Sequence, residues 1–230
     1  MVKHTAGDAV DALVRPLLVA PVTGTAVSTL AAPFGIETVS ASGPGAARAD
    51  EVQLDLGEGP AWQAFRTAAP VFLPDLGVDG QAADAWPAAR TALTGMGIAG
   101  VLAVPLTVGA LGIGTLSLYT DEVGRLPTEA IDRAAHVQPA AARAVLEAAL
   151  HRAASERPGE WSGGQYSRRE VHQAVGMVAA QTGATVDDAL LLLRAAAFGS
   201  DRSLAQLSAA VLDREVDFSP GGRGAERDQS

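Results

Sequence analysis

The chain has 230 residues and a mass of 23.3 kDa, enough for one large domain or two small ones. Hydrophobic residues make up 48% and charged residues 19%, which excludes wholesale disorder. The formal net charge of −9 repels nucleic acid, so any nucleic-acid binding needs a local patch. Cysteine is absent, which excludes disulfides, thiolate metal ligands and cysteine nucleophiles.

The pattern in the first half of the chain predicts one helix followed by short strands. Residues 5–20 predict a helix that ends before Pro21. No apolar stretch is long and uninterrupted enough for a bilayer span or a leader peptide, so we expect a cytoplasmic protein. Short apolar runs bounded by Gly, Pro and Asp are typical of strands, and they lie at Ala26–Leu30, Ile36–Val39, Val52–Leu56, Val71–Leu73, Gly100–Leu106 and Gly112–Tyr119.

The last two of these runs predict a β-hairpin. They are separated by a segment that contains Gly109, a residue suited to the turn. In the second strand Leu116 and Leu118 alternate with polar residues, which indicates a strand with one buried face. Helices are expected between the middle strands, at Pro60–Ala68 and Trp86–Gly95.

A long helix is predicted from Pro127 to Ala154, with Thr128 as its cap. Pro139 should kink this helix. An Ala-rich seam recurs along it at a step near 3.5: Ile131, Ala134, Ala135, Gln138, Ala141, Ala142, Val145, Ala149 and Arg152. This seam fits either a helix that packs on its own domain or a dimer interface, and the sequence leaves both open.

A linker rich in turn formers follows at residues 157–166, and three short helices follow the linker. Ser167 and Thr185 each begin a capping box, for helices that end near Gln181 and Phe198. Ser200 or Asp201 is expected to cap the third helix. A core this small would be only marginally stable alone, so we expect the bundle to pack against a partner subunit or the first domain. Residues 217–230 are predicted to be a disordered tail.

Catalytic machinery is not predicted. The four histidines form no metal-binding spacing, and no nucleophile motif occurs. We therefore expect no catalytic residues, no metal site, no cofactor and no enzymatic activity. Glu58 lies between two glycines and before Pro60, where its carboxylate either satisfies backbone donors or contacts a ligand. Trp62, Trp86 and Tyr119 are candidates for lining a ligand pocket, with simple packing as the alternative.

A set of short motifs is spread over the first 120 residues: Glu51-Val52-Gln53, Gly57-Glu58-Gly59-Pro60, Ala69-Pro70-Val71, Pro74-Asp75-Leu76, Trp86-Pro87, Ala103-Val104-Pro105-Leu106, Leu111-Gly112 and Leu116. With these motifs, residues 8–150 resemble the GAF domains of actinobacterial regulators. This resemblance implies a PAS-like sensory fold with a pocket for a small molecule. The family pattern often has Cys after Gly-Pro, where this chain has Ala61. Thiol-based sensing and methionine-sulfoxide reduction are therefore not expected of this chain.

The three C-terminal helices carry a second set of motifs: Arg169-Glu170-Val171, Gln173 through Val178, Asp188-Ala189, Leu193-Arg194, Arg202-Ser203-Leu204 and Leu207-Ser208. With these motifs, residues 165–215 resemble an ANTAR domain. ANTAR domains are three-helix RNA-binding modules of transcription antiterminators that act as dimers on paired stem-loops. The resemblance, together with arginine chemistry and an unexplained helical glycine, makes these residues the candidate RNA contacts: Arg168, Arg169, Gly176, Arg194, Arg202 and Ser203. A Lys usual in the first helix of that family is Val175 here.

These observations predict an α+β chain in five parts. A GAF-like sensory domain (1–126) with an antiparallel sheet is followed by a connecting helix (127–156), the linker, an ANTAR-like bundle (167–216) and the tail. The predicted function is a homodimeric, RNA-binding antitermination regulator that binds RNA stem-loops and a small-molecule signal. One alternative is a signal-sensing protein-interaction module with degenerate RNA binding, favoured by Val175 and by a balance of four Arg against four acidic residues in 165–210. A DNA-binding regulator is the other alternative, although the second and third helices offer few polar groups to read bases.

Overall fold

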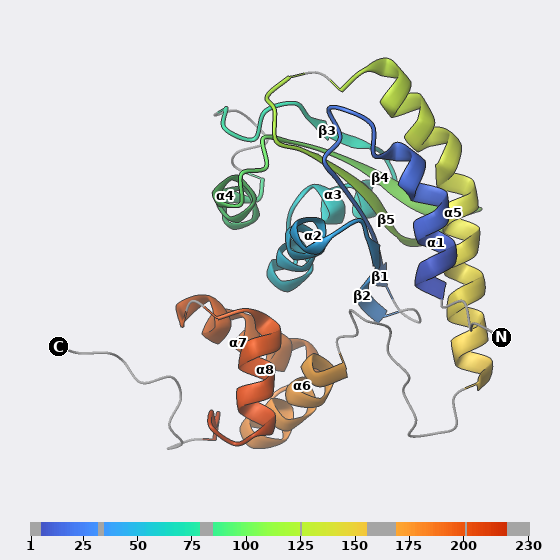
Figure 1. Cartoon of the computed structure of the whole chain (residues 1–230). Coiled ribbons are helices and arrows are strands. Elements are labelled where there is room, and N and C mark those ends of the chain that lie inside the picture. The colour runs from blue at the N-terminus through green and yellow to red at the C-terminus, as the bar shows by residue number, and fades with distance from the viewer. Residues whose placement is uncertain are drawn as a thin grey trace. The chain divides into compact units, whose positions relative to one another are not determined.

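The structure is a computed structural model that describes residues 6–31, 35–78, 85–124, 126–155, 169–200 and 202–219. The chain divides into two compact units, residues 1–166 and residues 167–230, and Figure 1 shows both. The predicted linker at 157–166 and residues 220–230 of the predicted tail lie outside the described residues.

An antiparallel five-stranded sheet forms the centre of the N-terminal unit. Its strands are β1 (Gly24–Ala31), β2 (Gly35–Ala41), β3 (Val71–Leu73), β4 (Gly100–Val108) and β5 (Leu111–Thr120), in the order β2-β1-β5-β4-β3. The predicted hairpin is confirmed, because β4 pairs with β5 from Gly100–Thr120 to Val108–Leu111. Gly109 in its turn has a φ of 60°, a conformation that glycine adopts without strain.

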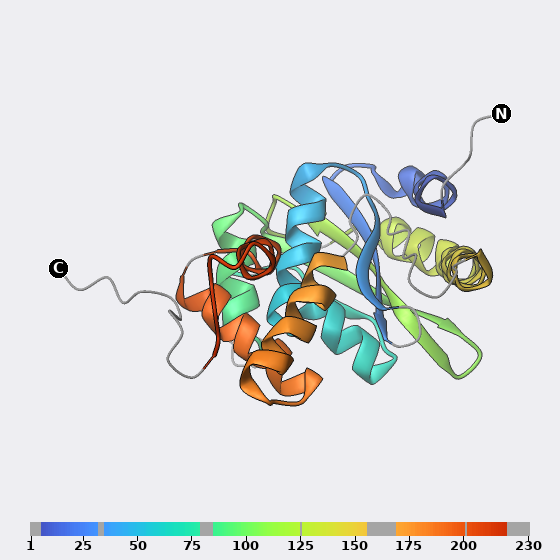
Figure 2. The ribbon, with the colours of Figure 1, turned by 90° about the horizontal axis from the view of Figure 1, so that it is seen from below.

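Helices cover both faces of this sheet. One face carries α1 (Ala6–Val14), which continues into the short 3-10 helix η1 (Arg15–Leu17), and α5 (Thr128–Ser155). The other face carries α2 (Pro44–Leu56), α3 (Pro60–Thr67) and α4 (Pro87–Gly95). Figures 1 and 2 show the strands between these two groups of helices. Each face has its own core, with Val27, Leu116 and Leu118 on the α5 side and Ala26, Trp86 and Tyr119 on the α2–α4 side.

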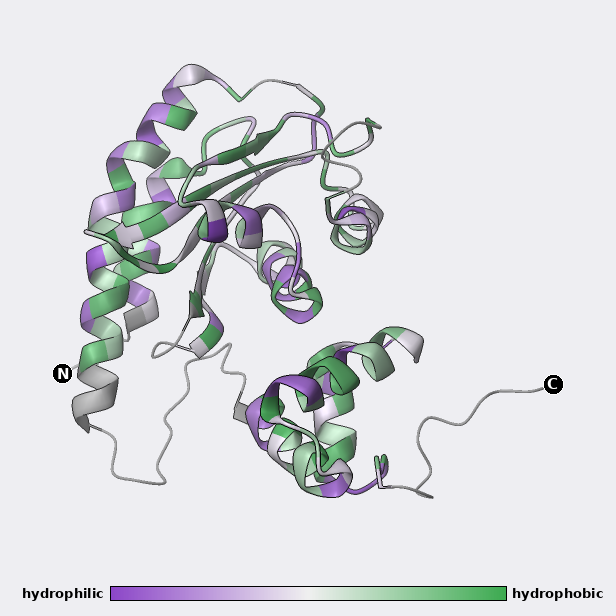
Figure 3. Ribbon diagram, turned by 180° about the vertical axis from the view of Figure 1, so that it is seen from behind, coloured by the Kyte–Doolittle hydropathy of each residue, from purple (hydrophilic) through white to green (hydrophobic). Residues whose placement is uncertain are grey.

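The long helix α5 packs on its own domain, one of the two interpretations that its sequence left open. Ala134, Ala141, Ala142 and Val145 are fully buried in the core that α5 shares with α1 and the sheet. Figure 3 shows polar and apolar segments alternating along this helix, as expected when one side faces a core. The opposite side is exposed and largely polar, with Asp132, His136, Arg143 and Glu147.

Two prolines are accommodated where α5 meets the sheet. The helix runs through Pro139, which lies on its exposed side. Pro105 lies in β4 two residues beyond Ala103, the last residue of β4 that pairs with β3, so one side of the strand is an edge there. Gln138 of α5 donates a hydrogen bond from Nε2 to the Pro105 carbonyl oxygen at 3.1 Å, which attaches the helix to this strand.

The structure corrects two predictions. The run Val52–Leu56 is the end of helix α2 and not a strand. Its buried neighbours Ala46, Ala49, Asp50 and Gln53 recur at helical spacing, and the short apolar run did not reveal this period. Helix α8 is capped by Ser203 and not by Ser200 or Asp201, because the Ser203 hydroxyl accepts the Gln206 N–H and the Gln206 side chain accepts the Ser203 N–H.

The C-terminal unit contains α6 (Arg169–Thr182), α7 (Val186–Gly199) and α8 (Leu204–Leu212). Their buried side chains form one cluster, which includes Val178, Leu193 and Leu207. Thr185 caps α7, because its hydroxyl accepts the Asp188 N–H at 3.1 Å, and the same hydroxyl donates to the Asp188 carboxylate at 2.8 Å. The unit is thus a three-helix bundle with a small aliphatic core.

Gly114 offers a test of how closely β5 approaches β1. A Cβ at this position would overlap the carbonyl oxygen of Ser28, which belongs to the backbone of β1 and cannot rotate away. We expect Gly114→Ala to lower the free energy of unfolding of the N-terminal unit by more than about 3 kcal/mol, measured by chemical denaturation.

Gly45→Ala is the matched control, because nothing lies within 4 Å of a Cβ at this position in α2. We expect the control to be as stable as the parent or slightly more stable. Equal stability of the two variants would contradict the close packing of β1 on β5.

Candidate functional site

A buried carboxylate lies between α2 and the sheet. Thr38, Ser28 and Thr115 are directly opposite one another on β2, β1 and β5. Asp50 of α2, with an exposed fraction of 0%, accepts a hydrogen bond from Thr38 Oγ1 at 2.6 Å and one from Ser28 Oγ at 3.2 Å. The Ser28 and Thr115 hydroxyl oxygens are 3.4 Å apart, which continues the chain of polar groups into β5. We call Thr38, Ser28, Thr115 and Asp50 the polar cluster.

Gln53, one turn further along α2, connects three elements. Its Nε2 donates to the Tyr119 hydroxyl of β5 at 3.1 Å and to the Ala49 carbonyl oxygen at 3.3 Å. Its Oε1 accepts the Ala61 N–H at 3.0 Å, at the start of α3. Burial, and after it the nearby Asp50 carboxylate, raises the pKa of Tyr119 well above its ordinary value of 10.0, so the phenol is neutral at physiological pH.

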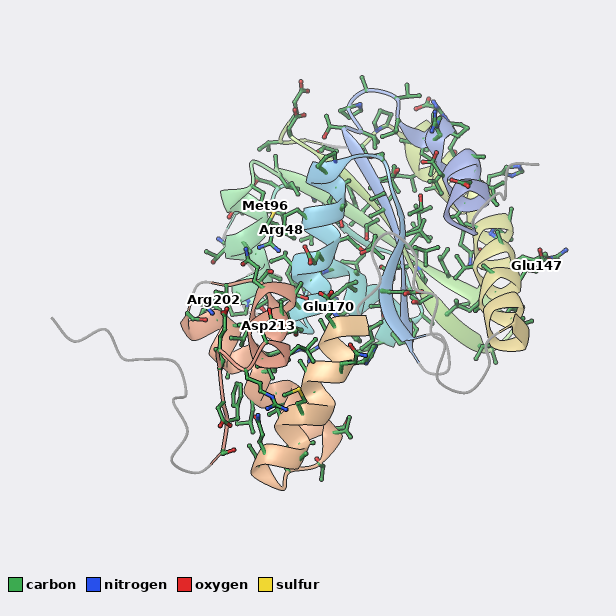
Figure 4. All side chains as sticks on the ribbon, turned by 60° about the horizontal axis from the view of Figure 1, so that its bottom comes forward. Arg48, Met96, Glu147, Glu170, Arg202 and Asp213 are labelled. Atoms are coloured by element: carbon green, nitrogen blue, oxygen red, sulfur yellow. The ribbon has the colours of Figure 1, made fainter. Side chains whose placement is uncertain are left out.

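A groove of about 250 Å³ opens beside this network. It lies between the start of α2 and the end of α4, and Tyr119 is one of its lining residues. Arg48 and Met96 also line it, and Figure 4 shows these two side chains next to each other. The full lining is Thr23, Gly24, Gly45, Ala46, Arg48, Met96, Gly97, Ile98, Tyr119, Thr120 and Asp121. The groove therefore combines an apolar wall with an arginine, as small-molecule sites commonly do.

The other three predicted ligand residues hold helices together. Glu58 Oε1 accepts the Ala89 N–H at 3.0 Å and so caps the first turn of α4. Trp86 donates from Nε1 to Gln63 Oε1 at 2.8 Å. Trp62 donates from Nε1 to the Gln53 carbonyl oxygen at 2.8 Å, and the Arg66 guanidinium lies 5.3 Å from the centre of its ring. Of the four candidates, Tyr119 is the one that lines the groove.

Sequence reasoning missed the polar cluster and Gln53. The signal available was weak, because serine and threonine are ordinary residues on the polar face of a strand. Helix α2 gives the more specific signal for this buried polar site. It carries Asp50 and Gln53 three residues apart, and its other inward positions are apolar. The strand prediction for Val52–Leu56 obscured this helical face.

The predicted RNA contacts are distributed over the three helices of the C-terminal unit. Gly176 is exposed on α6, and nothing lies within 4 Å of a Cβ at that position, so the unit itself does not explain a glycine there. Arg194 is half-buried on α7. Arg202 is exposed just beyond α7, and Ser203 caps α8. Arg168 lies outside the described residues, and of Arg169 only the backbone is described.

The described part of the chain offers neither a metal site nor a membrane span. Within these ranges, no group of three or more His, Asp or Glu side chains is arranged to hold a metal ion. Among the helices that the structure describes, none combines the length and the apolar character that a membrane span needs.

The order of the sheet and its two helical layers define an α+β domain. The family model described as "GAF domain" matches residues 6–156, and the chain belongs to this family. The N-terminal unit is therefore a signal-sensing module. The match includes α5, which completes the core of the domain.

Several solved structures resemble the chain at low identity. A domain of a putative two-component sensor histidine kinase from Sinorhizobium meliloti is 15% identical, with a TM-score of 0.46, over 66% of this chain and 95% of that one. The type II free methionine-R-sulfoxide reductase from Thermoplasma acidophilum is 16% identical, with a TM-score of 0.48, over 62% and 93%. The GAF-B domain of DevS from Mycobacterium smegmatis is 23% identical, with a TM-score of 0.43, over 65% and 97%. No curated protein matches the chain.

The raised pKa of Tyr119 predicts how stability depends on pH. A group with a folded pKa above its unfolded value contributes stability that is complete below the unfolded pKa and is lost as pH rises through the folded pKa. The chain has two tyrosines, so Tyr166→Phe leaves Tyr119 as the one phenol. In this variant we expect the phenolate absorbance at alkaline pH to appear well above pH 10 and together with unfolding.

Tyr166→Phe/Tyr119→Phe is the control, and its stability should fall less between neutral and strongly alkaline pH. A phenolate that forms near the ordinary value of 10.0 in the folded protein would contradict the burial of Tyr119 beside Asp50.

Proposed function

We propose that this protein is a cytoplasmic, homodimeric regulator whose C-terminal unit binds RNA stem-loops and thereby acts in transcription antitermination. The main support is the order of three helices, with α7 and α8 capped as described above, Arg194 on α7 and Arg202 just beyond it, together with the resemblance of residues 165–215 to ANTAR domains. The GAF domain senses the signal that controls this binding. The protein makes and breaks no bond in this role.

The groove is the proposed site for the signal molecule. Its volume of about 250 Å³ is slightly below the ~300–1,000 Å³ of pockets that bury drug-sized ligands, so it suits a smaller molecule. A ligand there would touch Tyr119, whose hydroxyl is joined through Gln53 to the first turn of α3. Binding would in this way change the hydrogen bonds that position α2 and α3 relative to β5.

RNA binding by this unit depends on few charges. Arg is well suited to it, because a planar guanidinium pairs with phosphate through two N–H groups and stacks on unpaired bases. Four arginines balanced by four acidic residues in 165–210 give little general attraction to RNA, however. Two copies that bind two hairpins together would raise the apparent affinity without additional contacts in either copy.

The alternative of a protein-interaction module has one specific observation in its favour. Val175 stands where ANTAR sequences usually have Lys, and it is buried in the core of the three-helix bundle. The basic group usual at that position is therefore replaced by a core side chain. A DNA-binding role has less support, because the exposed face of α7 carries Leu191, Leu192 and Phe198 and offers few groups that read base edges.

Titration of RNA binding against salt separates these functions. We expect the full chain to bind a tandem-hairpin RNA, with an affinity that falls as salt rises. Arg194→Ala/Arg202→Ala should weaken binding by about tenfold or more and should also make it less dependent on salt, because fewer guanidinium groups then pair with phosphates. Fluorescence anisotropy at matched salt measures both effects.

Arg143→Ala is the control, because Arg143 is exposed on α5 in the other unit. Undiminished binding by the double variant would exclude these arginines as contacts. An absence of binding by the parent chain even at low salt would favour the protein-interaction alternative, and preference for duplex DNA over hairpin RNA would favour the DNA-binding one.

A further inference from the structure

Helix α7 exposes an apolar face. Among the described residues of the C-terminal unit, all the large hydrophobic side chains that are exposed belong to this helix: Val186, Leu191, Leu192 and Phe198. Leu191 is 59% exposed and Phe198 is 71% exposed. Soluble proteins seldom leave neighbouring apolar side chains on one helix in contact with water unless something covers them.

The exposed face runs along the whole helix. Ala189, Leu193 and Ala197 are buried and face the core of the bundle. Asp188, Leu191, Ala195 and Phe198 recur at i, i+3, i+7 and i+10, on the side opposite to the core, and all four are exposed. We call these four residues the α7 stripe. It begins with a carboxylate, has its smallest side chain near the middle and ends with an aromatic ring.

The long helix α5 does not offer a comparable surface. Most of its Ala-rich seam lies in the core of the GAF domain, and Leu150 is the one large hydrophobic side chain that is exposed on its described part. A dimer of this chain therefore needs another apolar face, and α7 carries more exposed large hydrophobic side chains than any other described helix.

We infer that the α7 stripe is the surface through which two copies of this chain pair, with the two α7 helices antiparallel. If Ala195 lies against Ala195 of the second copy, residues whose numbers add to 390 are opposite each other. Leu192 then meets Phe198, and Leu191 meets Gly199, where a Cβ would find open space and a leucine therefore fits. The small Ala195 at the two-fold axis lets the helices approach closely. Such a contact is self-complementary and closes as a dimer.

Charge favours the antiparallel arrangement. Asp188 is opposite Arg202 of the second copy in this register, and both side chains are exposed. Arg202 is placed directly after α7, where its N–H donates to the Ala197 carbonyl oxygen at 3.0 Å. A parallel arrangement would instead bring Asp187 and Asp188 of both copies together at one end, which is unfavourable. A guanidinium has five N–H donors, so pairing with Asp188 leaves donors for a phosphate.

The size of the stripe indicates a reversible dimer. An α-helix of 14 residues is about 21 Å long, and one face of it is smaller than the ~800 Å² that each partner contributes to a stable interface. We expect the dimer to form in the micromolar range and in the absence of RNA. The inference rests on the proposed function only because that function requires a dimer. The test of the pairing does not depend on RNA binding.

Sedimentation equilibrium of the full, RNA-free chain tests the pairing. With rising concentration, the mass of the parent should rise from 23.3 kDa towards twice that value. Leu191→Ser/Phe198→Ser should weaken association by about tenfold or more, since it removes the apolar contacts on both sides of Ala195. Leu150→Ser is the matched control, because Leu150 is also 59% exposed but lies on α5, and it should associate like the parent.

A charge exchange tests the orientation. Asp188→Arg and Arg202→Asp should each weaken association, and Asp188→Arg/Arg202→Asp should restore it, because the pair is re-formed with its signs reversed. Circular dichroism establishes that each variant keeps its helices. A parent chain that stays monomeric at every concentration would overturn the inference, and would mean that the GAF domain or RNA covers the stripe. Equal association of the Leu191→Ser/Phe198→Ser variant and the parent would also overturn it.

Discussion

The alternation of side chains along β5 determines what lies on each side of the GAF sheet. Leu116 and Leu118 enter the aliphatic core beneath α1 and α5, so Thr115, Ser117 and Tyr119 must face α2–α4. That second face is covered too, and a buried polar group without a partner costs about 1–3 kcal/mol. Helix α2 supplies hydrogen-bond partners on this face, because the Asp50 carboxylate accepts the Ser28 and Thr38 hydroxyls and the Gln53 amide reaches Tyr119. The packing of α2 on the sheet is therefore set by hydrogen bonds as much as by apolar contact.

The same hairpin connects the groove to α5. Tyr119 of β5 lines the groove on one face of the sheet, and Pro105 of β4 accepts the Gln138 amide on the other. Strands β4 and β5 pair along nearly their full length, so the groove and the helix that completes the domain are attached to the same hairpin. Because α5 is part of the core and the family match includes it, it belongs to the sensory module and does not merely connect two parts.

The sequence predicted local features well and the burial of polar faces poorly. The β4–β5 hairpin and the cap at Thr185 depend on residues close in the chain, and patterns of turn and capping residues reveal such features directly. Whether the polar face of β5 meets water or another helix depends on α2, whose Gln53 is 66 residues away from Tyr119, and alternation alone cannot distinguish the two cases. For the run Leu190–Leu193 the pattern overestimates burial. Four consecutive leucines suggest a core, but a helix can turn only part of such a run inward.

The exposed leucines of α7 and the weak charge of the C-terminal unit are two aspects of one problem. A bundle of about 50 residues buries too little apolar surface to be robust alone, and four arginines balanced by four acids attract RNA weakly. Antiparallel pairing of α7 addresses both, because it covers Leu191 and Phe198 and doubles the number of arginines on one particle. The two Arg202 residues would then lie at opposite ends of the helix pair, about 20 Å apart, the length of α7. Under the proposed function, a separation of this size would let the two sets of guanidinium groups contact different hairpins, which is the physical reason that a paired RNA target would suit a protein with so few positive charges.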